Sequence, residues 1–282
     1  MQKTALLIVV GVFMVIGGIY FSFRGHAPER HMPGSQLMKI AQQWDMPNEL
    51  EEISGISFID DNRLACVQDE KGVVYIYNLK TSKVEKTIEF GDSGDYEGIT
   101  MVGTTCYVLR SDGVLFKIED LDSSPKKTVK IETDLKREYN FEGLCYDKAN
   151  NQLLLAIKDK ASDDYKPVYA FDIKSEKLKQ DPFLEIPFDS KVFDKLEEKQ
   201  SEKLIRPSDL AINPKDGNVY IIEGSNPKLM SITQAGVPQK LYVLKEKQFA
   251  QPEGISFNST GEVFISNEGH GAPGNIIKLS LE

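Results

Sequence analysis

A short phrase centred on Glu-Gly-Ile returns five times along the chain and constrains its fold more than any other feature. The copies start at Ser54, Glu97, Glu142, Ser208 and Glu253, so that the intervals between them are 43, 45, 66 and 45 residues. Three intervals agree within two residues, and the long one equals the same unit plus about 21 residues. A period of this length is typical of supersecondary units that stack or are arranged radially.

Each period contains four short apolar runs separated by turn residues. In the second period these runs are Ile99–Val102, Cys106–Leu109, Val114–Ile118 and Lys127–Ile131. Their two-residue alternation and the Gly, Ser and Asp residues between them predict antiparallel strands. Four strands in roughly 40 to 45 residues make one propeller blade. The sequence therefore predicts an all-β protein, a five-bladed β-propeller of four-stranded blades.

The two ends of the repeat region predict how the ring closes. The last repeat ends after its third strand, Asn275–Ser280, whereas the run Leu37–Trp44 stands ahead of the first repeat. We expect this N-terminal strand to complete the last blade, because an unclosed propeller would leave two sheet edges open. The predicted propeller spans residues 37–282.

The N-terminus predicts a membrane segment. Thr4–Phe23 is a run of twenty uncharged residues, and a helix of that length crosses a hydrocarbon core of about 30 Å. We predict a transmembrane anchor in 1–24 and a polar tether in 25–36; a cleaved signal peptide is the alternative, which Pro28 after the only plausible cleavage site argues against. Basic residues stand in nearly equal number on the two sides of this run, so the positive-inside rule does not decide its orientation. The usual behaviour of short N-terminal anchors puts the propeller on the extracytoplasmic, periplasmic side of the cell membrane.

The long fourth interval contains an insertion at 189–205. Val192, Phe193, Leu196 and Leu204 fall at roughly helical spacing among charged residues, which predicts a short amphipathic helix. The insertion joins an outermost strand to the innermost strand of the next blade. We therefore expect it to lie on the face where inner strands begin and to shield the channel mouth without taking part in the ring.

Charge and cysteine usage exclude some functions. The net charge is −9, from 34 basic and 43 acidic residues, and there is no basic stripe of the kind that nucleic acids require. Cys66, Cys106 and Cys145 each fall in a predicted inner strand without metal-finger spacing. We expect buried free thiols, with a Cys66–Cys106 bridge as the remote alternative, and a monomeric protein.

The repeats predict a site at one mouth of the central channel. The first strand of each blade starts, and the second ends, on the same face because the two form an antiparallel hairpin. The innermost strands line the channel, so Glu97, Glu142 and Glu253 should converge there as candidate metal ligands. Further candidate residues of the mouth are Asp69, Arg110, Lys158, Asp209, Glu223, Asn226, Asn267 and Glu268.

Crowded carboxylates repel one another and their pKa values rise unless a positive charge lies between them. Ca²⁺ accepts 6–8 oxygen ligands in flexible geometry, whereas a site with almost no His or Cys suits Zn²⁺ poorly. We therefore predict a calcium ion as the cofactor. The alternative is that each Glu-Gly only marks a strand entry, with Glu capping backbone amides and Gly permitting a tight turn.

Several of these features together resemble the SdiA-regulated family of bacterial envelope proteins. They are the Glu-Gly phrases around Glu97, Glu142 and Glu253, the serines that replace Glu at positions 54 and 208 of the first and fourth repeats, the insertion and the N-terminal anchor. The resemblance covers Trp44 to Leu281 and implies a five-bladed propeller, distantly similar to NHL-repeat propellers, with a calcium site and no assigned activity. The matching Glu positions are Glu97, Glu142 and Glu253, whereas Asp209 stands where the resemblance suggests Gly.

Two classes of function fit these predictions. The first is a membrane-tethered binding or scaffold propeller whose mouth receives a small molecule or a peptide. The alternative is a calcium-dependent hydrolase similar to lactonases and esterases among six-bladed propellers. In that case Glu142 or Glu223 would act as general base, and Lys158 or Arg110 would hold an oxyanion, with Asn226 and Asn267 among the metal ligands. No nucleophile–base pair is visible in the sequence, which favours binding.

Overall fold

The structure is a computed structural model that describes residues 38–123, 127–133, 140–159 and 162–280. The predicted anchor, 1–24, and tether, 25–36, lie outside these residues. Within the described part of the chain, no helix is both long enough and apolar enough to cross a membrane.

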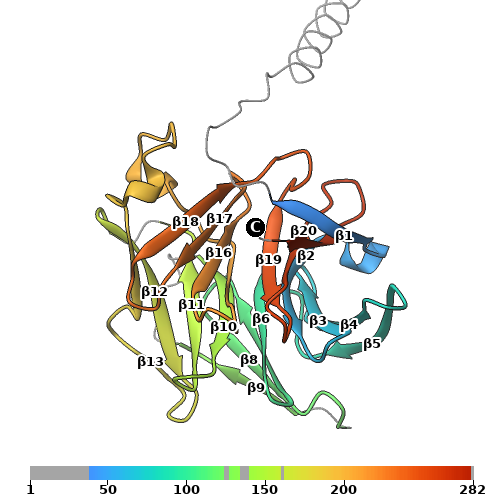
Figure 1. The fold of residues 1–282 in the computed structure, drawn as a ribbon. Coiled ribbons are helices and arrows are strands. Elements are labelled where there is room, and N and C mark those ends of the chain that lie inside the picture. Colours follow the sequence, from blue (N-terminus) through green and yellow to red (C-terminus); the bar gives the residue numbers. More distant parts are fainter. Residues whose placement is uncertain (1–37, 124–126, 134–139, 160–161, 281–282) are drawn as a thin grey trace, which may run out of the picture. The chain divides into compact units, whose positions relative to one another are not determined.

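Five antiparallel sheets are arranged radially, which confirms the predicted five-bladed propeller (Figure 1). Blade 1 consists of β2 (Ile53–Phe58), β3 (Arg63–Gln68), β4 (Val73–Asn78) and β5 (Lys83–Glu89). Blade 2 consists of β6 (Tyr96–Val102), β7 (Thr105–Arg110), β8 (Leu115–Glu119) and β9 (Lys127–Ile131). Blade 3 consists of β10 (Phe141–Asp147), β11 (Gln152–Ile157), β12 (Tyr165–Asp172), β13 (Lys177–Leu178) and β14 (Leu184–Pro187).

The last two blades complete the ring. Blade 4 consists of β15 (Asp209–Ile212), β16 (Val219–Glu223), β17 (Lys228–Ile232) and β18 (Pro238–Val243). Blade 5 consists of β19 (Pro252–Phe257), β20 (Val263–Asn267), β21 (Asn275–Ser280) and, from the other end of the chain, β1 (Lys39–Asp45).

Strand β1 closes the ring, as predicted. It pairs antiparallel with β21, with Trp44 opposite Ile276. The Trp44 indole stacks on Phe264 of the same blade, with ring centroids 5.9 Å apart, and its Nε1 donates a 2.8 Å hydrogen bond to the Leu79 carbonyl, which follows β4 in blade 1. The N-terminal strand therefore holds together the two blades that are farthest apart in sequence.

The hydrophobic core consists of five clusters, one between each pair of neighbouring blades. Strand β7 shows how the sequence produces this arrangement. Cys106 and Val108 belong to the cluster shared with blade 1, whereas Tyr107 and Leu109 belong to the cluster shared with blade 3. A strand buried on both faces becomes continuously apolar, and this explains why the inner strands contain few polar residues. The three cysteines are buried free thiols, as expected.

Glycine in the repeated phrase lets the inner strands approach one another closely. A Cβ atom on Gly55 would lie 2.8 Å from the Glu97 carbonyl, and one on Gly143 would lie 2.9 Å from the Asp209 Cα. Real Cβ atoms do not tolerate such contacts with backbone, so these positions require glycine. The Gly of Glu-Gly-Ile is thus explained by packing around the channel.

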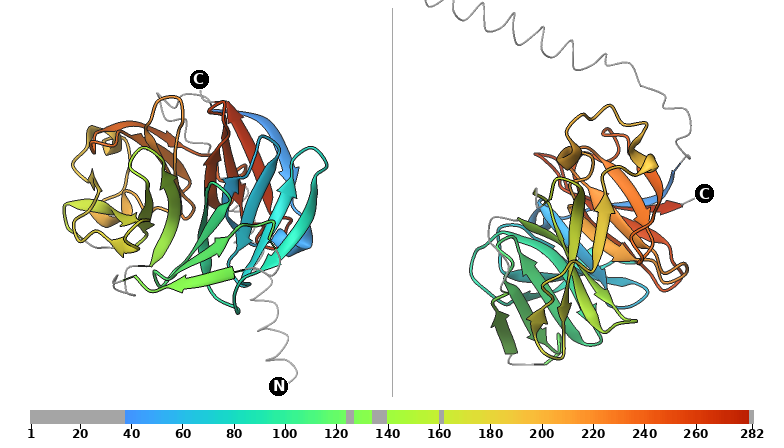
Figure 2. Two further views of the ribbon diagram at one scale, coloured as in Figure 1. Left: turned by 90° about the horizontal axis from the view of Figure 1, so that it is seen from below. Right: turned by 90° about the vertical axis from the view of Figure 1, so that its left-hand side faces the viewer.

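The predicted helix in the insertion was wrong. Residues 189–205 form only two separate 3₁₀ turns, η3 (Lys191–Phe193) and η4 (Ser201–Lys203). The charged run at 197–199 interrupts the apolar stripe, and a stripe covering only one or two turns is too short to stabilise a helix. Phe193 and Ile205 instead lie buried in the cluster between blades 3 and 4, and η3 packs against β18. Figure 2 shows the gold ribbon of the insertion beside the orange strands of blade 4.

Candidate functional site

A β-bulge at the start of three inner strands positions the predicted glutamates. The register of the inner hairpin shifts at Glu97 in blade 2, at Glu142 in blade 3 and at Glu253 in blade 5. A bulged residue has no partner across the ladder, and its side chain is re-aimed. In blade 4 the register runs without a shift from Asp209 onward. The fourth phrase, which has Ser208-Asp209 in place of Glu-Gly, therefore lacks the bulge from Asp209 onward.

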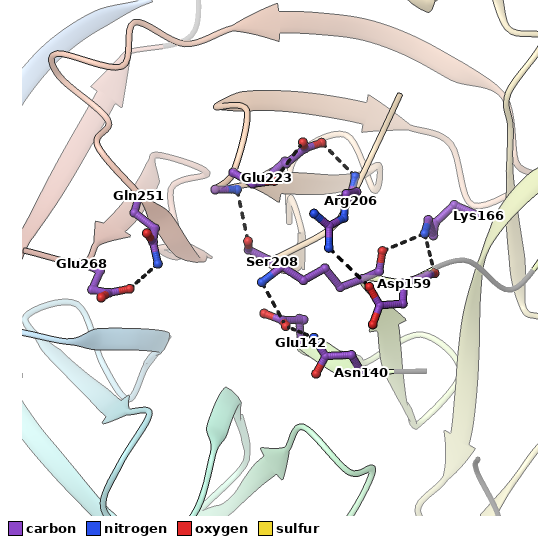
Figure 3. Close-up of polar contacts among 12 residues, drawn as sticks. Asn140, Glu142, Asp159, Lys166, Arg206, Ser208, Glu223, Gln251 and Glu268 are labelled. Carbon is purple, nitrogen blue, oxygen red and sulfur yellow. Dashed lines mark hydrogen bonds and ion pairs between the residues drawn. The ribbon is translucent and has the colours of Figure 1, made fainter. Parts of the chain in front are cut away.

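The three glutamates line one cavity of about 100 Å³ at the channel mouth. Its walls come from blades 1, 2, 3 and 5 and consist of Glu52, Ile53, Ser54, Asp69, Glu97, Glu142, Lys158, Gln251, Glu253 and Glu268. Figure 3 shows Glu142 on one side of the opening and Gln251 with Glu268 on another. Among the described residues that line the cavity, six carboxyl groups thus face one ammonium group, that of Lys158. The structure brings together Glu97, Glu142 and Glu253 with the predicted Asp69, Lys158 and Glu268.

Glu142 and Lys158 form the central ion pair of this cavity. The Glu142 side chain is 2% exposed, and its Oε1 accepts hydrogen bonds from Asn140 Nδ2 at 2.8 Å and from Lys158 Nζ at 3.1 Å. Burial raises the pKa of Glu142 to about 7, although the Lys158 ammonium opposes this shift. Burial alone would lower the pKa of Lys158, but the carboxylates of Glu142 and Glu253 outweigh it and raise that pKa.

Burial is the main cause of the raised pKa values of Glu97, Asp69 and Glu253, and neighbouring carboxylates add to it. Burial, followed by repulsion from Glu142, raises the pKa of Glu97 to about 10. Burial and the nearby Glu52 raise the pKa of Asp69 to about 6. Burial also raises the pKa of Glu253. In the protein alone, the cavity therefore retains protons at neutral pH.

Two oxygen atoms of the cavity residues have no hydrogen-bond partner. They are Asp69 Oδ1 and Glu253 Oε2, both buried and unpartnered among the described residues. Leaving such an acceptor unsatisfied costs about 1–3 kcal/mol. The described residues contain no group of three Asp, Glu, His or Cys side chains close enough to hold a metal ion directly. A cation in this cavity would therefore need water molecules to complete its ligand shell.

Five of the predicted mouth residues lie outside the cavity lining. Arg110 forms a two-pronged ion pair with Asp112, with both nitrogen–oxygen distances at 2.9 Å. The remaining four are Asp209, Glu223, Asn226 and Asn267. Asn226 is exposed, and Asn267 Nδ2 donates to Asn275 Oδ1 at 3.0 Å. Arg110, Glu223 and Asn267 are held by other side chains, and Asp209 by backbone amides, whereas Asn226 faces solvent.

Asp209 has a structural role in the inner ring. Its side chain is fully buried, with Oδ1 accepting the Leu144 amide of blade 3 at 3.1 Å and Oδ2 accepting the Ile255 amide of blade 5 at 2.9 Å. Burial raises its pKa well above the usual range even though these amides oppose the shift. Asp209 thus links the inner strands of three blades.

Glu223 belongs to a buried network beside the mouth. It forms a 2.7 Å ion pair with Lys228 in which both side chains are 1% exposed, and it accepts the Arg206 amide at 2.8 Å. Nearby, Lys166 Nζ donates to the carbonyls of Lys158 and Asp159 at 2.8 and 2.6 Å (Figure 3). Burial lowers the pKa of Lys166 to about 8. Lys166 thereby fixes the backbone that carries Lys158.

Sequence reasoning missed the residue two positions before each repeated phrase. Glu52 and Gln251 hold this position and line the cavity, while Asn140 holds it in blade 3 and donates to Glu142. The remaining two such residues, Asp95 and Arg206, are also polar. The signal that could have found them is a polar side chain at this offset in all five repeats. Lys166 left no such periodic signal.

The insertion packs into the core more than expected. Of the described residues that line the cavity, none comes from 189–205. Its apolar side chains instead extend the core between blades 3 and 4. The insertion thus contributes to the core of the ring, contrary to expectation, whereas its shielding of the mouth stays a prediction.

The fold and site define a five-bladed propeller with an acidic channel mouth. A family model described as SdiA-regulated matches residues 38–270, and the chain therefore belongs to the SdiA-regulated family. A comparison with curated protein sequences found no match.

Solved structures with propeller folds are similar to this chain in fold alone. Glutaminyl cyclase of Myxococcus xanthus matches with a TM-score of 0.58 and 14% identity, over 87% of this chain and 96% of the other. The PQQ-bound aldose sugar dehydrogenase of Streptomyces coelicolor matches with a TM-score of 0.54 and 12% identity, over 89% of this chain and 100% of the other.

Proposed function

We propose that this protein is a membrane-anchored, extracytoplasmic binding propeller whose channel mouth holds a calcium ion. The observation that carries the proposal is the acidic cavity, in which Asp69 Oδ1 and Glu253 Oε2 are buried and find no hydrogen-bond partner among the described residues. Glu97, Glu142 and Glu253 are proposed to hold the ion in part through bridging water molecules, with Asp69, Glu52 and Glu268 around them. A divalent cation would offset both the burial and the mutual repulsion that raise the pKa values of Glu97 and Glu142.

The size and chemistry of the cavity favour calcium over other metals. A volume of about 100 Å³ equals the space of about three water molecules at roughly 30 Å³ each. This is enough for one ion with a few waters. Carboxylate oxygens suit hard cations, and calcium tolerates the irregular, partly water-filled ligand shell that a wide mouth offers better than magnesium does.

The same dimensions argue against the hydrolase alternative. Small-molecule sites usually occupy about 300–1,000 Å³, which is several times the volume of this cavity. In addition, Arg110 is paired with Asp112 and Glu223 with Lys228, and the other candidates for base and oxyanion holder, Glu142 and Lys158, are paired with each other. We therefore do not propose a hydrolase.

The membrane anchor is the second part of the proposal and rests on the uncharged run Thr4–Phe23. We propose that it tethers the propeller through 25–36 to the outer side of the cell membrane. Protease added to intact spheroplasts should degrade the propeller and leave a cytoplasmic marker intact. Protection of the propeller in intact spheroplasts and its degradation after lysis would contradict this orientation.

The calcium site is tested by thermal unfolding with a matched control. Chelator should lower the melting temperature of the wild type, and Ca²⁺ should restore it better than Mg²⁺, because ligand at 100 times its Kd adds about 2.7 kcal/mol to the stability. Glu142→Gln with Glu253→Gln should abolish this response. The exposed pair Glu49→Gln with Glu89→Gln should leave it unchanged. If chelator leaves the melting temperature of the wild type unchanged, the calcium site is refuted.

A further inference from the structure

A groove separate from the channel mouth runs along the outer edge of blade 3. Its volume is about 900 Å³, within the usual range for ligand sites. It follows β14, from Pro182 before the strand to Asp189 after it. The opposite wall is the turn at 234–236 between β17 and β18 of blade 4, where a Cβ on Gly236 would lie 3.3 Å from the Glu185 carbonyl. The turn touches β14 at Glu185, so the groove lies at the boundary between blades 3 and 4.

The lining of this groove combines apolar surface with negative charge. Tyr165, Phe183 and Pro187 are partly exposed along it, and they offer flat aromatic and proline surfaces. Four of the fourteen lining residues are acidic, and none of these described lining residues is Lys or Arg. The carboxylates of Asp164, Glu185 and Asp189 are exposed.

The length of the groove indicates the form of its occupant. Strand β14 has four residues, which extend over roughly 14 Å at about 3.4 Å per residue. An extended peptide of similar length fits along it. Arg or Lys side chains would reach the acidic rim, and proline or leucine side chains would cover the aromatic floor, as in grooves that recognise extended proline-rich segments.

We propose that this groove binds an extended segment of a partner protein in which basic residues alternate with proline and other apolar residues. A second copy of this chain is a poorer occupant, because pairing two β14 edges would bring Glu185 and Asp189 of each copy against like charges. The overall charge of −9 also attracts basic partners and repels a second copy. The proposal does not depend on the calcium site.

The proposal is tested with a fluorescein-labelled nonapeptide of three Arg-Pro-Leu repeats, titrated with the full-length protein in detergent micelles. Fluorescence anisotropy should show saturable binding that is the same with Ca²⁺ and with chelator. Glu185→Lys with Asp189→Lys should weaken binding about tenfold, because two attractive contacts become repulsive. Glu89→Lys with Asp92→Lys, exposed in blade 1, makes the same change in net charge and should change binding less than about threefold.

A second variant separates the contribution of the apolar floor to peptide binding from the contribution of charge. Phe183→Ser keeps the charge and should also weaken binding about tenfold, if circular dichroism shows that it is folded. Equal weakening by the groove and control pairs would show attraction by net charge alone and overturn the proposal. Absence of saturable binding, or equal binding of a Glu-Pro-Leu peptide, would overturn it as well. So would a dimer in sedimentation equilibrium that Glu185→Lys dissociates.

Discussion

Replacing Glu97 with glutamine should stabilise the protein at neutral pH in the absence of calcium. Burial and the neighbouring Glu142 raise the pKa of Glu97 from an ordinary 4.5 to about 10. Because the folded-state pKa lies above that of the unfolded chain, folded Glu97 keeps its proton as the pH rises while the unfolded chain loses it. Stability from this group is therefore lost progressively between pH 4.5 and about pH 10.

The size of the effect follows from the pH difference. From pH 4.5 to pH 7 the loss is about 3 kcal/mol, at 1.36 kcal/mol for each pH unit. Glutamine occupies the same volume without a proton to lose, so Glu97→Gln avoids this loss. We expect the variant to exceed the wild type by up to about 3 kcal/mol at pH 7 and to equal it near pH 4.

Urea unfolding in chelator at the two pH values measures this difference. The single tryptophan, Trp44, reports on ring closure because it is buried in β1. Glu89→Gln on the exposed outer strand of blade 1 is the control and should stay within about 0.5 kcal/mol of the wild type. With saturating Ca²⁺ the order should reverse, since the variant lacks a proposed ligand. A Glu97→Gln variant that is less stable at pH 7 without calcium, or equally shifted at both pH values, would refute the electrostatic reasoning.

Three further predictions concern the ring. Asp209→Ala should lower the free energy of unfolding by about 2–6 kcal/mol, because two buried amides lose their acceptor; a loss under 1 kcal/mol in urea unfolding would contradict its linking role. Deleting the chain up to Trp44 should lower the melting temperature, whereas deleting it only up to Gly34 should not; equal melting of the two truncations would exclude closure by β1. Phe193→Ala should cost about 3–5 kcal/mol, since that side chain is 4% exposed; a near-neutral effect would restore the view that the insertion lies outside the ring.

The blade architecture was predictable because each of the five repeats encodes one blade. Period, strand alternation and the missing last strand are each visible in the sequence, and they led to the number of blades and to the pairing of β1 with β21. Glu97, Glu142 and Glu253 were found for the same reason. Their bulges recur at the same place in each phrase.

Features that occur once were not predictable in the same way. Asp209 was predicted to lie at the channel mouth. Its strand lacks the bulge found at Glu97, Glu142 and Glu253, and its side chain accepts amides from two neighbouring inner strands instead. Arg110 and Glu223 lie on the expected face, yet each forms an ion pair, with Asp112 and Lys228 respectively, that keeps its charge out of the cavity. The insertion showed helical spacing, but burial of Phe193 and Ile205 between two blades determined its path. Such outcomes depend on contacts between residues distant in sequence.

The calcium site is tested most directly by isothermal titration calorimetry of the chelator-stripped protein with Ca²⁺ at pH 7. We expect one ion to bind per chain. Because Glu97 and Glu142 have pKa values of about 10 and about 7, binding should release protons, and the heat should vary with the ionisation enthalpy of the buffer. Glu142→Gln with Glu253→Gln should abolish the titration. Absence of binding heat in every buffer, or identical titrations of the wild type and this variant, would contradict a calcium site at the channel mouth.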